Sequence, residues 1–280
     1  MCILTIKKDL NLMPLRAKSR IVVLGNLEDR PWSKSDKFAP VLRSDSIRLV
    51  TSSAVEQCRV LKQGDCKMAF CNGDLPVDET TIIRSPCGDP DAPPTEYWLL
   101  KKTLYGLRRS PKHWFEKIDR FLKSMGLCPS THDPCLYTGF ISDPSSPDDT
   151  PSTVPLILGL YVDDFVYFSS SDDVERKFET ILFQLIDVNF MGVVEWFLGI
   201  HFSWRQSPTE VSVHLNQAAF AQNLVERNGL HDKGTSPLQT PYRSGIPIDA
   251  TPDTMEADDC PALLRRKVAF QSLVGSLGWL

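Results

Sequence analysis

Long apolar runs are missing from this 280-residue sequence. No run approaches the roughly eighteen consecutive apolar residues that a membrane-spanning helix needs. The opening residues, MCILTIKKDL, also lack the longer apolar core of a secretory signal peptide. Both absences predict a soluble intracellular chain that makes no use of a membrane.

Paired cysteine motifs are missing as well. None of the eight cysteines forms a CxxC pair, and the five histidines do not stand near them at the spacing of zinc ligands. A chain of this length with 42% hydrophobic residues can bury a core, as one large domain or two, without disulfide bonds. We therefore expect reduced, buried thiols.

A strong net charge is also absent, because the formal net charge at pH 7 is −4. This value argues against a protein that simply coats nucleic acid. The charge is uneven, however: residues 1–62 carry a net charge of +6 and the remaining residues carry −10. The basic potential is therefore concentrated at the front of the chain.

Hydrophobic periodicity and turn residues predict helices mixed with hairpins. Regular alternation of strands and helices is not found, so we expect an α+β fold. Residues 142–155, SDPSSPDDTPSTVP, have the composition of an exposed loop. The expected helices cover 46–60, 110–126, 171–185 and 216–230, and the expected strands cover 18–24 and 196–204.

The clearest helix is predicted over 110–126. Ser110 suits the N-cap, Pro111 suits the first helical position, and Gly126 suits the C-terminal stop. Lys117 and Lys123 are expected on its solvated side. Its apolar face comprises Trp114, Phe115, Ile118, Phe121, Leu122 and Met125.

Two adjacent carboxylates interrupt an apolar run in LILGLYVDDFVYF, residues 156–168. Apolar, aromatic and β-branched residues on both sides predict two short strands joined at or beside Asp163 and Asp164. Like charges this close repel, so the pair is costly unless a cation neutralises it. A solvated turn is the alternative interpretation.

A third carboxylate, Asp65, begins the apolar and aromatic segment CKMAF. Two divalent ions poised for phosphoryl transfer need several carboxylates that converge from different strands, because Mg²⁺ prefers oxygen ligands. Asp65, Asp163 and Asp164 could supply such a site. They are the candidate catalytic and metal-binding residues.

Eight segments, in order along nearly the whole chain, resemble the reverse transcriptase of copia-type LTR retrotransposons. The YVDD and LYGL(K/R)xxP signatures among them are highly specific, and a different metal-dependent nuclease or polymerase would not be expected to carry LYGLRRSP. The segments are RAKSRIVVLGN (16–26), SDKFAPVLRSDSIRLV (35–50), QGDCKMAFCNGDLP (63–76), WLLKKTLYGLRRSPKHWF (98–115), DPCLYTGF (133–140), LYVDDFVYF (160–168), FLGIHF (197–202) and SLVGSLGWL (272–280).

The resemblance implies a right-hand polymerase fold. Fingers and palm would occupy residues 1–205, and a partial thumb or connection region would occupy 206–280. It also implies an RNA-directed DNA polymerase in which Asp65, Asp163 and Asp164 hold two Mg²⁺ ions, with Mn²⁺ as a substitute. The implied partners are an RNA template, a DNA primer, dNTPs, and the integrase and RNase H regions of a larger polyprotein. The implied location is a cytoplasmic virus-like particle.

The same resemblance implies roles around the nucleotide. Phe70 matches an aromatic gate under the sugar, which would exclude a 2′-hydroxyl; a plain core phenylalanine is the alternative. Lys18 and Arg20 fall in a fingers strand that faces the triphosphate, although Lys18 also suits solvated surface charge. Arg109 stands where the family has Gln near the templating pair. Since Arg cannot accept hydrogen bonds, nucleotide contacts are expected to differ.

Primer and template contacts are implied elsewhere. Leu198 and Gly199 resemble the primer grip, for which an ordinary strand is the alternative, and Tyr161 would pack beside the primer terminus or simply fill the palm. We expect Arg108 and Arg109 to face the template, because a turn before a helix N-terminus presents its side chains and free N–H groups.

Departures from the family leave two other hypotheses open. Met68 replaces a usual polar residue, and the chain lacks both the segment before the fingers and a continuation after Leu280, so it resembles a fragment of a longer polyprotein. One alternative is a truncated, catalytically inactive nucleic-acid-binding remnant. The other is a translated relic that does not fold independently.

Overall fold

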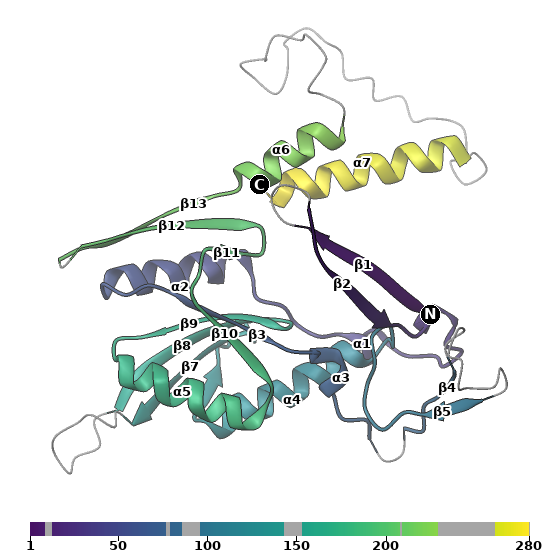
Figure 1. The fold of residues 1–280 in the computed structure, drawn as a ribbon, viewed down its shortest axis with the longest axis horizontal. Coiled ribbons are helices and arrows are strands. Elements are labelled where there is room, and N and C mark those ends of the chain that lie inside the picture. The colour runs from purple at the N-terminus through teal and green to yellow at the C-terminus, as the bar shows by residue number, and fades with distance from the viewer. Residues whose placement is uncertain are drawn as a thin grey trace, which may run out of the picture. The chain divides into compact units, whose positions relative to one another are not determined.

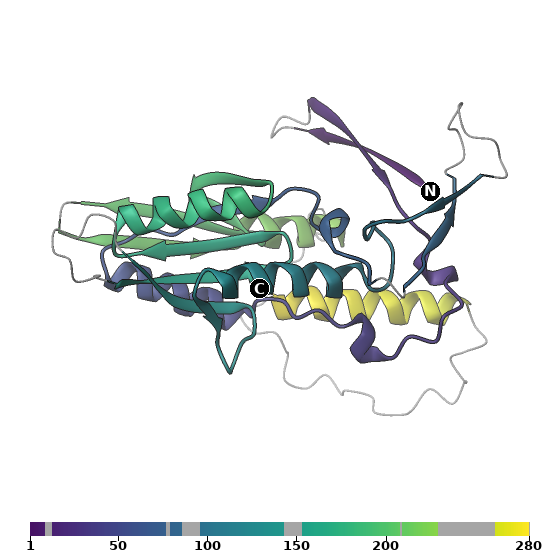
Figure 2. The same cartoon turned by 90° about the horizontal axis from the view of Figure 1, so that it is seen from below.

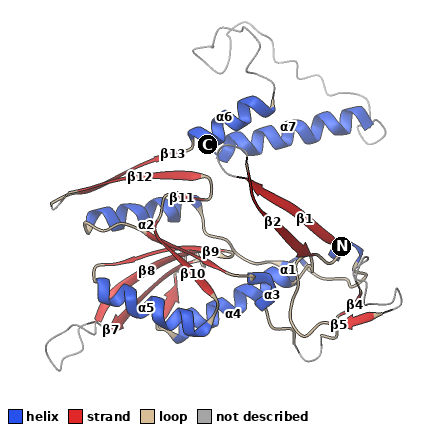
Figure 3. Cartoon of the chain, viewed as in Figure 1, coloured by secondary structure: helices blue, strands red, loops and turns tan. Residues whose placement is uncertain are grey.

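The computed structural model describes residues 1–8, 13–76, 79–85, 96–142, 153–207, 209–228 and 261–279. By its internal contacts the chain divides into two compact units. The first comprises Met1–Val194 and Trp204–Val213, and the second comprises Glu195–Ser203 and His214–Leu280. Helices and strands are mixed in the chain, which confirms the predicted α+β class (Figure 3).

A six-stranded sheet forms the centre of the first unit (Figure 1). Its strand order is β10-β3-β9-β8-β7-β6, and every neighbouring pair is antiparallel. The order brings β3, which is early in the chain, between two strands that follow it by about a hundred residues. The strands are β3 (Lys62–Cys66), β6 (Leu127–Pro129), β7 (Leu136–Ser142), β8 (Thr153–Tyr161), β9 (Asp164–Ser169) and β10 (Val188–Val193).

Three helices cover the sheet. The helix α2 (Ser44–Glu56) packs on one face, and α4 (Ser110–Ser124) and α5 (Asp172–Leu185) lie on the other (Figure 1). On the α2 side, Gly159 lacks a side chain where Leu42 packs, so a Cβ there would meet a methyl group at 2.7 Å. On the α5 side, Phe178 stacks edge to face against Phe165 at 6.4 Å.

The first unit also contains two hairpins and three short helical segments. The hairpins are β1 (Cys2–Lys8) with β2 (Pro14–Ile21), and β4 (Ile82–Arg84) with β5 (Tyr97–Leu99). Figures 1 and 2 both place them beyond the same end of the sheet. The predicted strand over 18–24 therefore begins earlier and stops at Ile21. The short segments are η1 (Gly25–Leu27), α1 (Lys34–Lys37) and α3 (Ala69–Asn72).

The prediction of one strand over 196–204 is wrong, because this segment forms two strands joined by a turn. Residues Trp196–Phe197 form β11, which pairs with the start of β12 (Ile200–Gln206). Leu198 and Gly199 both have positive φ, 51° and 78°, as a tight type I′ hairpin requires. The other elements of this region are β13 (Val211–Asn216), α6 (Ala218–Arg227) and α7 (Pro261–Trp279).

The four predicted helices are confirmed as α2, α4, α5 and α6. The predicted N-cap of α4, Ser110, is wrong by one residue, because Arg109 is the N-cap. The Ser110 hydroxyl instead donates to the Leu104 carbonyl at 2.6 Å. Gly126 follows the helix with φ +86°, as its stop role requires. The predicted closing Gly229 and most of the loop over 142–155 lie outside the described residues.

The core lies between the sheet and its helices. The six cysteines whose state is described are free thiols. Their predicted burial is wrong in part, because Cys66 and Cys135 are buried whereas Cys2, Cys58 and Cys128 are exposed. No helix among the residues with described structure is long and apolar enough to cross a membrane. The largest fully buried side chains include Trp114, Tyr137, Tyr167, Phe165, Phe168 and Phe178.

Candidate active site

One row of side chains crosses four strands of the central sheet. Tyr161 of β8 is the register partner of Asp164 of β9, which pairs in turn with Asp65 of β3, which pairs with Asn189 of β10. Directly opposed residues of antiparallel strands project from the same face of a sheet. The fold therefore brings Asp65 and Asp164, 99 positions apart in the sequence, onto one face as neighbours.

The next row explains why this register is held. Gly64, directly before Asp65, is opposed by Phe165 on β9, directly after Asp164. A Cβ on Gly64 would collide with the Phe165 ring, so the missing side chain makes room for the aromatic ring. Phe165 also stacks edge to face on Phe190 of β10, at 6.2 Å between ring centroids. Since successive residues alternate faces, burying this aromatic row turns the carboxylates to the other face.

The turn between β8 and β9 carries the third carboxylate. Val162 and Asp163 form it, and Val162 has φ 58°, a left-handed conformation that is rare for a β-branched residue. The Cys66 N–H donates to the Asp163 carbonyl at 2.7 Å, and the Trp114 indole N–H donates to the Val162 carbonyl at 2.6 Å. The hairpin predicted from the sequence is thus confirmed, with the aspartates at and beside its turn.

Burial and mutual repulsion dominate the electrostatics of the three carboxylates. Burial, together with the charges of Asp163 and Asp65, raises the pKa of Asp164 to about 6. Burial and the Asp65 carboxylate also raise the pKa of Asp163. The pKa of the neighbouring Cys66 thiol is raised by burial and then by all three carboxylates. This is the electrostatic situation in which a bound cation is favourable.

Two predicted basic residues lie near the turn. Lys18 and Arg20 of β2 act on the Asp163 carboxyl, because their charges lower its pKa against the larger, opposite effect of burial. The register of the hairpin places Lys18 opposite Thr5 and Arg20 opposite Ile3, so both face the same way along β2. The structure thus brings these predicted residues into the electrostatic neighbourhood of the carboxylates.

Phe70 lies on α3, five residues beyond Asp65. Its ring is half-buried and stacks edge to face on Tyr105, with 5.6 Å between centroids. It also borders a small cavity of about 170 Å³, whose other lining residues include Trp114, Leu160 and Val162. Phe70 therefore lies beside the carboxylate turn, and it is not a fully buried core residue.

The structure gives Arg108 and Arg109 partners inside the protein. The Arg108 guanidinium donates to the carbonyls of Gly25 and Asn26. Arg109 pairs with Glu79, whose side chain is 9% exposed, and stacks over the Trp32 ring at 4.6 Å. Their predicted nucleotide and template contacts stay predictions, and both half-buried side chains have partners within the protein.

The predicted solvation of the two lysines on α4 is half right. Lys117 bonds to the Asn72 carbonyl and to Asp74, both at 2.9 Å, and its side chain is 15% exposed. Lys123 is exposed and pairs with Asp119 one turn away. Nothing in the local pattern of the helix indicates that Asp74 approaches it.

Leu198 and Gly199, the candidate primer grip, belong to the second unit. They form the β11–β12 turn described above. Within that unit Trp196 packs on His201 at 4.6 Å between ring centroids. A backbone-led turn is what a grip on a nucleic-acid strand requires, and the primer role stays a prediction.

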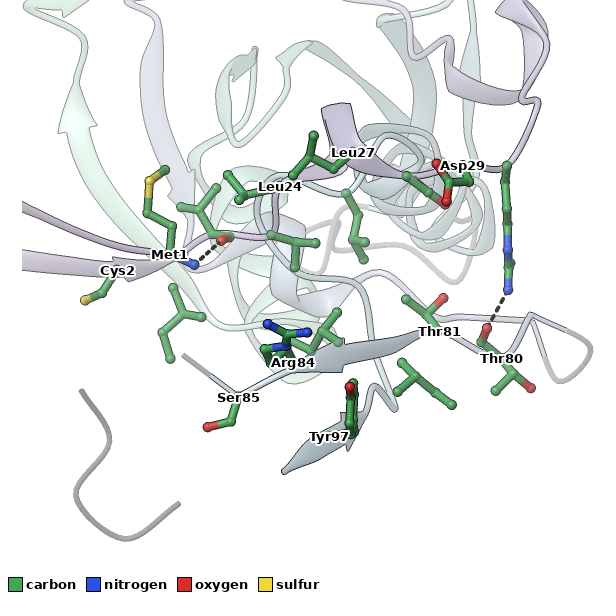
Figure 4. Close-up of a pocket in the computed structure, with 18 residues that line it drawn as sticks. Met1, Cys2, Leu24, Leu27, Asp29, Thr80, Thr81, Arg84, Ser85 and Tyr97 are labelled. Atoms are coloured by element: carbon green, nitrogen blue, oxygen red, sulfur yellow. Dashed lines mark hydrogen bonds between the residues drawn. The ribbon is translucent and has the colours of Figure 1, made fainter. Parts of the chain in front are cut away.

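A larger cavity of about 1120 Å³ lies apart from the carboxylates (Figure 4). Residues from the β1–β2 hairpin, η1 and the β4–β5 hairpin line it, among them Leu24, Thr81, Arg84 and Tyr97. Arg30 donates to the Thr80 carbonyl at its rim, at 2.6 Å. None of the site residues predicted from the sequence lines this cavity.

Three residues near the carboxylates were not predicted as site residues. Asn189 completes the row beside Asp65, but an isolated asparagine carries no sequence signal. Trp114 was predicted only as part of an apolar face, and Tyr105 only as part of the LYGL signature. Their roles depend on hydrogen bonds and ring contacts that the fold creates.

In the described part of the chain, no group of three or more His, Cys, Asp or Glu side chains is gathered closely enough to hold a metal ion as it stands. The backbone register nevertheless sets Asp65 beside Asp164, with Asp163 next in the chain. Carboxylate oxygens are ligands that Mg²⁺ prefers, and a bound ion would also relieve the repulsion between them. The residues present therefore fit a divalent-metal site once their side chains turn toward a shared ion.

Comparison with known proteins assigns the family. Residues 2–243 match the family described as reverse transcriptase (RNA-dependent DNA polymerase). The chain belongs to this family. This membership confirms the resemblance.

Its relatives among curated proteins are transposon polyproteins. The chain is 29% identical over 275 residues to the retrovirus-related Pol polyprotein from transposon TNT 1-94 of Nicotiana tabacum, covering 97% of this chain and 19% of the relative. It is 25% identical over 265 residues to that from transposon RE1 of Arabidopsis thaliana, covering 95% and 16%. A putative transposon Ty5-1 protein of Saccharomyces cerevisiae is 27% identical over 214 residues, covering 76% and 61%.

The chain thus spans about a fifth of the length of the first of these polyproteins. It spans 16% of the relative from transposon RE1. No solved structure matches the chain significantly.

Proposed function

We propose that this chain is an RNA-directed DNA polymerase that adds dNTPs to a primer 3′-OH through a site built on Asp65, Asp163 and Asp164. The observation that carries the proposal is the direct register pairing of Asp65 with Asp164, with Asp163 in the adjoining turn. Family membership supports the reaction class. We also assign the fingers and palm to residues 1–205 and a partial thumb or connection region to 206–280.

The three carboxylates would hold two Mg²⁺ ions, or Mn²⁺ in their place. Two bound ions would lower the pKa of the attacking hydroxyl and stabilise charge on the transferring phosphorus and the leaving pyrophosphate. The protein has to hold the carboxylate oxygens of these three residues in place. Asp65 and Asp164 are fixed by the strand register, and Asp163 by the bonds from Cys66 and Trp114 to the turn.

The remaining predicted residues have supporting roles in this proposal. Lys18 and Arg20 bind the triphosphate, for which the planar guanidinium is well suited. Phe70 excludes a 2′-hydroxyl beneath the sugar. Tyr161, which is half-buried and opposite Asp164, lies beside the primer terminus, and the Leu198–Gly199 turn grips the primer.

Two of the relatives are named as Pol polyproteins, which supports the wider setting that we propose. We propose an RNA template, a DNA primer and dNTPs as substrates, and integrase and RNase H regions as neighbours in a longer product. The proposed location is a cytoplasmic virus-like particle.

The test is primer extension on poly(A) annealed to oligo(dT), with Mg²⁺ and dTTP. The wild-type chain extends the primer, whereas Asp65→Asn and Asp163→Asn do not, because a neutral amide loses the charge that recruits the metal. Asp173→Asn is the matched control, since Asp173 is a surface carboxylate on α5 that pairs with Arg176. Wild-type turnover in Asp65→Asn would remove the assignment.

The same experiment separates the alternatives. An inactive nucleic-acid-binding remnant binds primer–template in a salt-dependent manner without extending it. A relic that does not fold shows no cooperative thermal transition by circular dichroism.

A further inference from the structure

Tyr105 is tied to the end of the β2 strand through its backbone. Its carbonyl accepts a hydrogen bond from the Val23 N–H at 2.8 Å. The following residue, Gly106, has φ +90°, and a Cβ there would collide with the Val23 carbonyl. Gly25 in turn has no room for a Cβ against the Gly106 carbonyl. Two glycines therefore allow this close approach, which fixes where the Tyr105 side chain begins.

The Tyr105 ring touches two of the predicted site residues. One edge contact joins it to Phe70, with 5.6 Å between centroids and an angle of 79° between the rings. The Arg20 guanidinium carbon lies 5.7 Å from the centroid of the same ring. Edge-to-face aromatic pairs and Arg–aromatic pairs are each attractive. The candidate sugar gate and a candidate triphosphate ligand thus share one neighbour.

Arg20 and the carboxylate turn also influence the hydroxyl of Tyr105. Burial, the most important effect, raises its pKa, and the charge of Asp163 acts in the same direction. Arg20 acts in the opposite direction, through its charge and a hydrogen bond to the hydroxyl. The Tyr105 ring therefore contacts both Phe70 and Arg20, and the hydroxyl lies within the electrostatic influence of Arg20 and of the carboxylate turn.

We infer that Tyr105 is a positioning residue of the nucleotide site, whose side chain holds Arg20 toward the triphosphate and whose ring braces Phe70 beneath the sugar. The inference rests on the proposed function, because it assigns a role within that site. It adds a specificity-determining residue between two groups that come from distant segments of the chain.

The two contacts can be separated by substitution. Tyr105→Phe removes the hydroxyl and keeps the ring, so it weakens the hold on Arg20, whose ring contact remains, while Phe70 stays braced. Tyr105→Leu removes both contacts, and Phe70 can then move away from the sugar. Nucleotide affinity should depend on the first contact, and discrimination between deoxyribose and ribose should depend on the second.

The experiment measures equilibrium binding of dTTP and of UTP to the full chain on a dideoxy-terminated primer–template, where no bond can form. We expect Tyr105→Phe to weaken both nucleotides by a similar factor, roughly three- to tenfold, because the hydroxyl acts on the triphosphate only through Arg20. Their affinity ratio stays at the wild-type value. Tyr105→Leu also brings that ratio about tenfold closer to one, by analogy with the energy of an aromatic pair.

Matched controls come from Tyr97, an exposed tyrosine on β5 that borders the larger cavity. Tyr97→Phe and Tyr97→Leu should change neither affinity nor ratio. Thermal melting of each variant shows whether the fold is retained. A loss of affinity from general destabilisation would be the same for both nucleotides in Tyr105→Leu and would leave the ratio unchanged.

The outcomes distinguish the positioning role of Tyr105 from the proposed polymerase function. Wild-type affinities in both Tyr105 variants overturn the inference, and an unchanged ratio in Tyr105→Leu overturns the bracing of Phe70. Extension of an ordinary primer by the wild-type chain keeps the proposed function intact in either case. If the wild-type chain neither binds dTTP nor extends a primer, the proposed function fails and this inference fails with it.

Discussion

The indole N–H of Trp114 donates a hydrogen bond to the carbonyl of Val162 at 2.6 Å. Trp114 is fully buried on α4, and Val162 is the residue with a left-handed backbone in the carboxylate turn. A β-branched residue holds that conformation only where its surroundings impose it. The bond therefore links a scaffold helix to the geometry of Asp163, the next residue.

Replacing Trp114 by Phe should disturb the turn more than the fold. The six-membered ring is retained, and the loss of one buried hydrogen bond and of the five-membered ring costs about 2–3 kcal/mol of unfolding free energy. Primer extension should fall about tenfold or more, because small displacements at a reacting centre are costly. The measurements are single-turnover extension and thermal melting.

Trp204→Phe is the control for this substitution. Its indole N–H also donates to a backbone carbonyl, that of Val194, at 2.8 Å. It should lose similar stability and keep its extension rate. If both variants lose extension equally, the turn has no special dependence on Trp114.

The raised pKa of Asp164 predicts a pH-dependent stability. Its usual value is near 3.8, and in the folded chain it is about 6. Between these values the folded state binds more protons than the unfolded state, so stability falls as pH rises through about 4 to 6. Asp164→Asn does not ionise at this position and so does not lose stability as the pH rises. In a chelating buffer at pH 7 it should therefore be more stable than the wild-type chain. The gain is about 1–2 kcal/mol, discounted because the carboxyl is partly exposed.

The comparison is made by chemical denaturation at pH 4 and pH 7. At pH 4 the two chains should have nearly equal stability, since Asp164 is then protonated in the fold. Adding Mg²⁺ at pH 7 should reduce the difference in unfolding free energy between the two chains, because the ion neutralises the wild-type carboxylates. A gap that is as large at pH 4 as at pH 7 would rule out titration of Asp164 as its cause.

Replacing Phe70 by Ala should relax sugar discrimination. The ring lies beside the carboxylate turn and borders a cavity of about 170 Å³, so its removal leaves open space beneath the sugar. We expect ribonucleotide incorporation to rise at least tenfold relative to deoxynucleotide incorporation, with dTTP and UTP compared on one template. An unchanged ratio in an active enzyme would reassign Phe70 to packing alone.

Replacing Arg108 and Arg109 by Ala should mainly destabilise the fold. Both side chains have partners within the protein, and removal of Arg109 leaves the nearly buried Glu79 without its cation. The expected loss is about 3 kcal/mol of unfolding free energy. Lys123→Ala, at an exposed pair on α4, should cost at most about 0.5 kcal/mol.

The salt dependence of primer–template binding tests the other role of these arginines. Removing one phosphate contact flattens the log–log slope by about 0.9 for a duplex. We expect the slope to stay near the wild-type value. A flatter slope with little loss of stability would instead favour the template-facing role.

Local patterns were sufficient for the elements that carry the site. The apolar run around Asp163 and Asp164 predicted a hairpin, and the amphipathic pattern after Ser110 predicted α4, because period and turn chemistry are properties of neighbouring residues. Local patterns failed at residues 196–204, where a turn with two positive φ values divides one apolar run into two strands. A leucine in the left-handed region gives no local warning of a turn.

The sequence by itself determined which carboxylates are present, the hairpin that carries two of them, the four main helices and, through its signatures, the family. Only the tertiary structure decided that Asp65 pairs with Asp164, that Trp114 holds the turn, and that Tyr105 lies between Arg20 and Phe70. It also decided that Arg108 and Arg109 have partners within the protein. Strand order and side-chain partners depend on packing between residues far apart in the chain, and such contacts leave no periodic trace in the sequence around either partner.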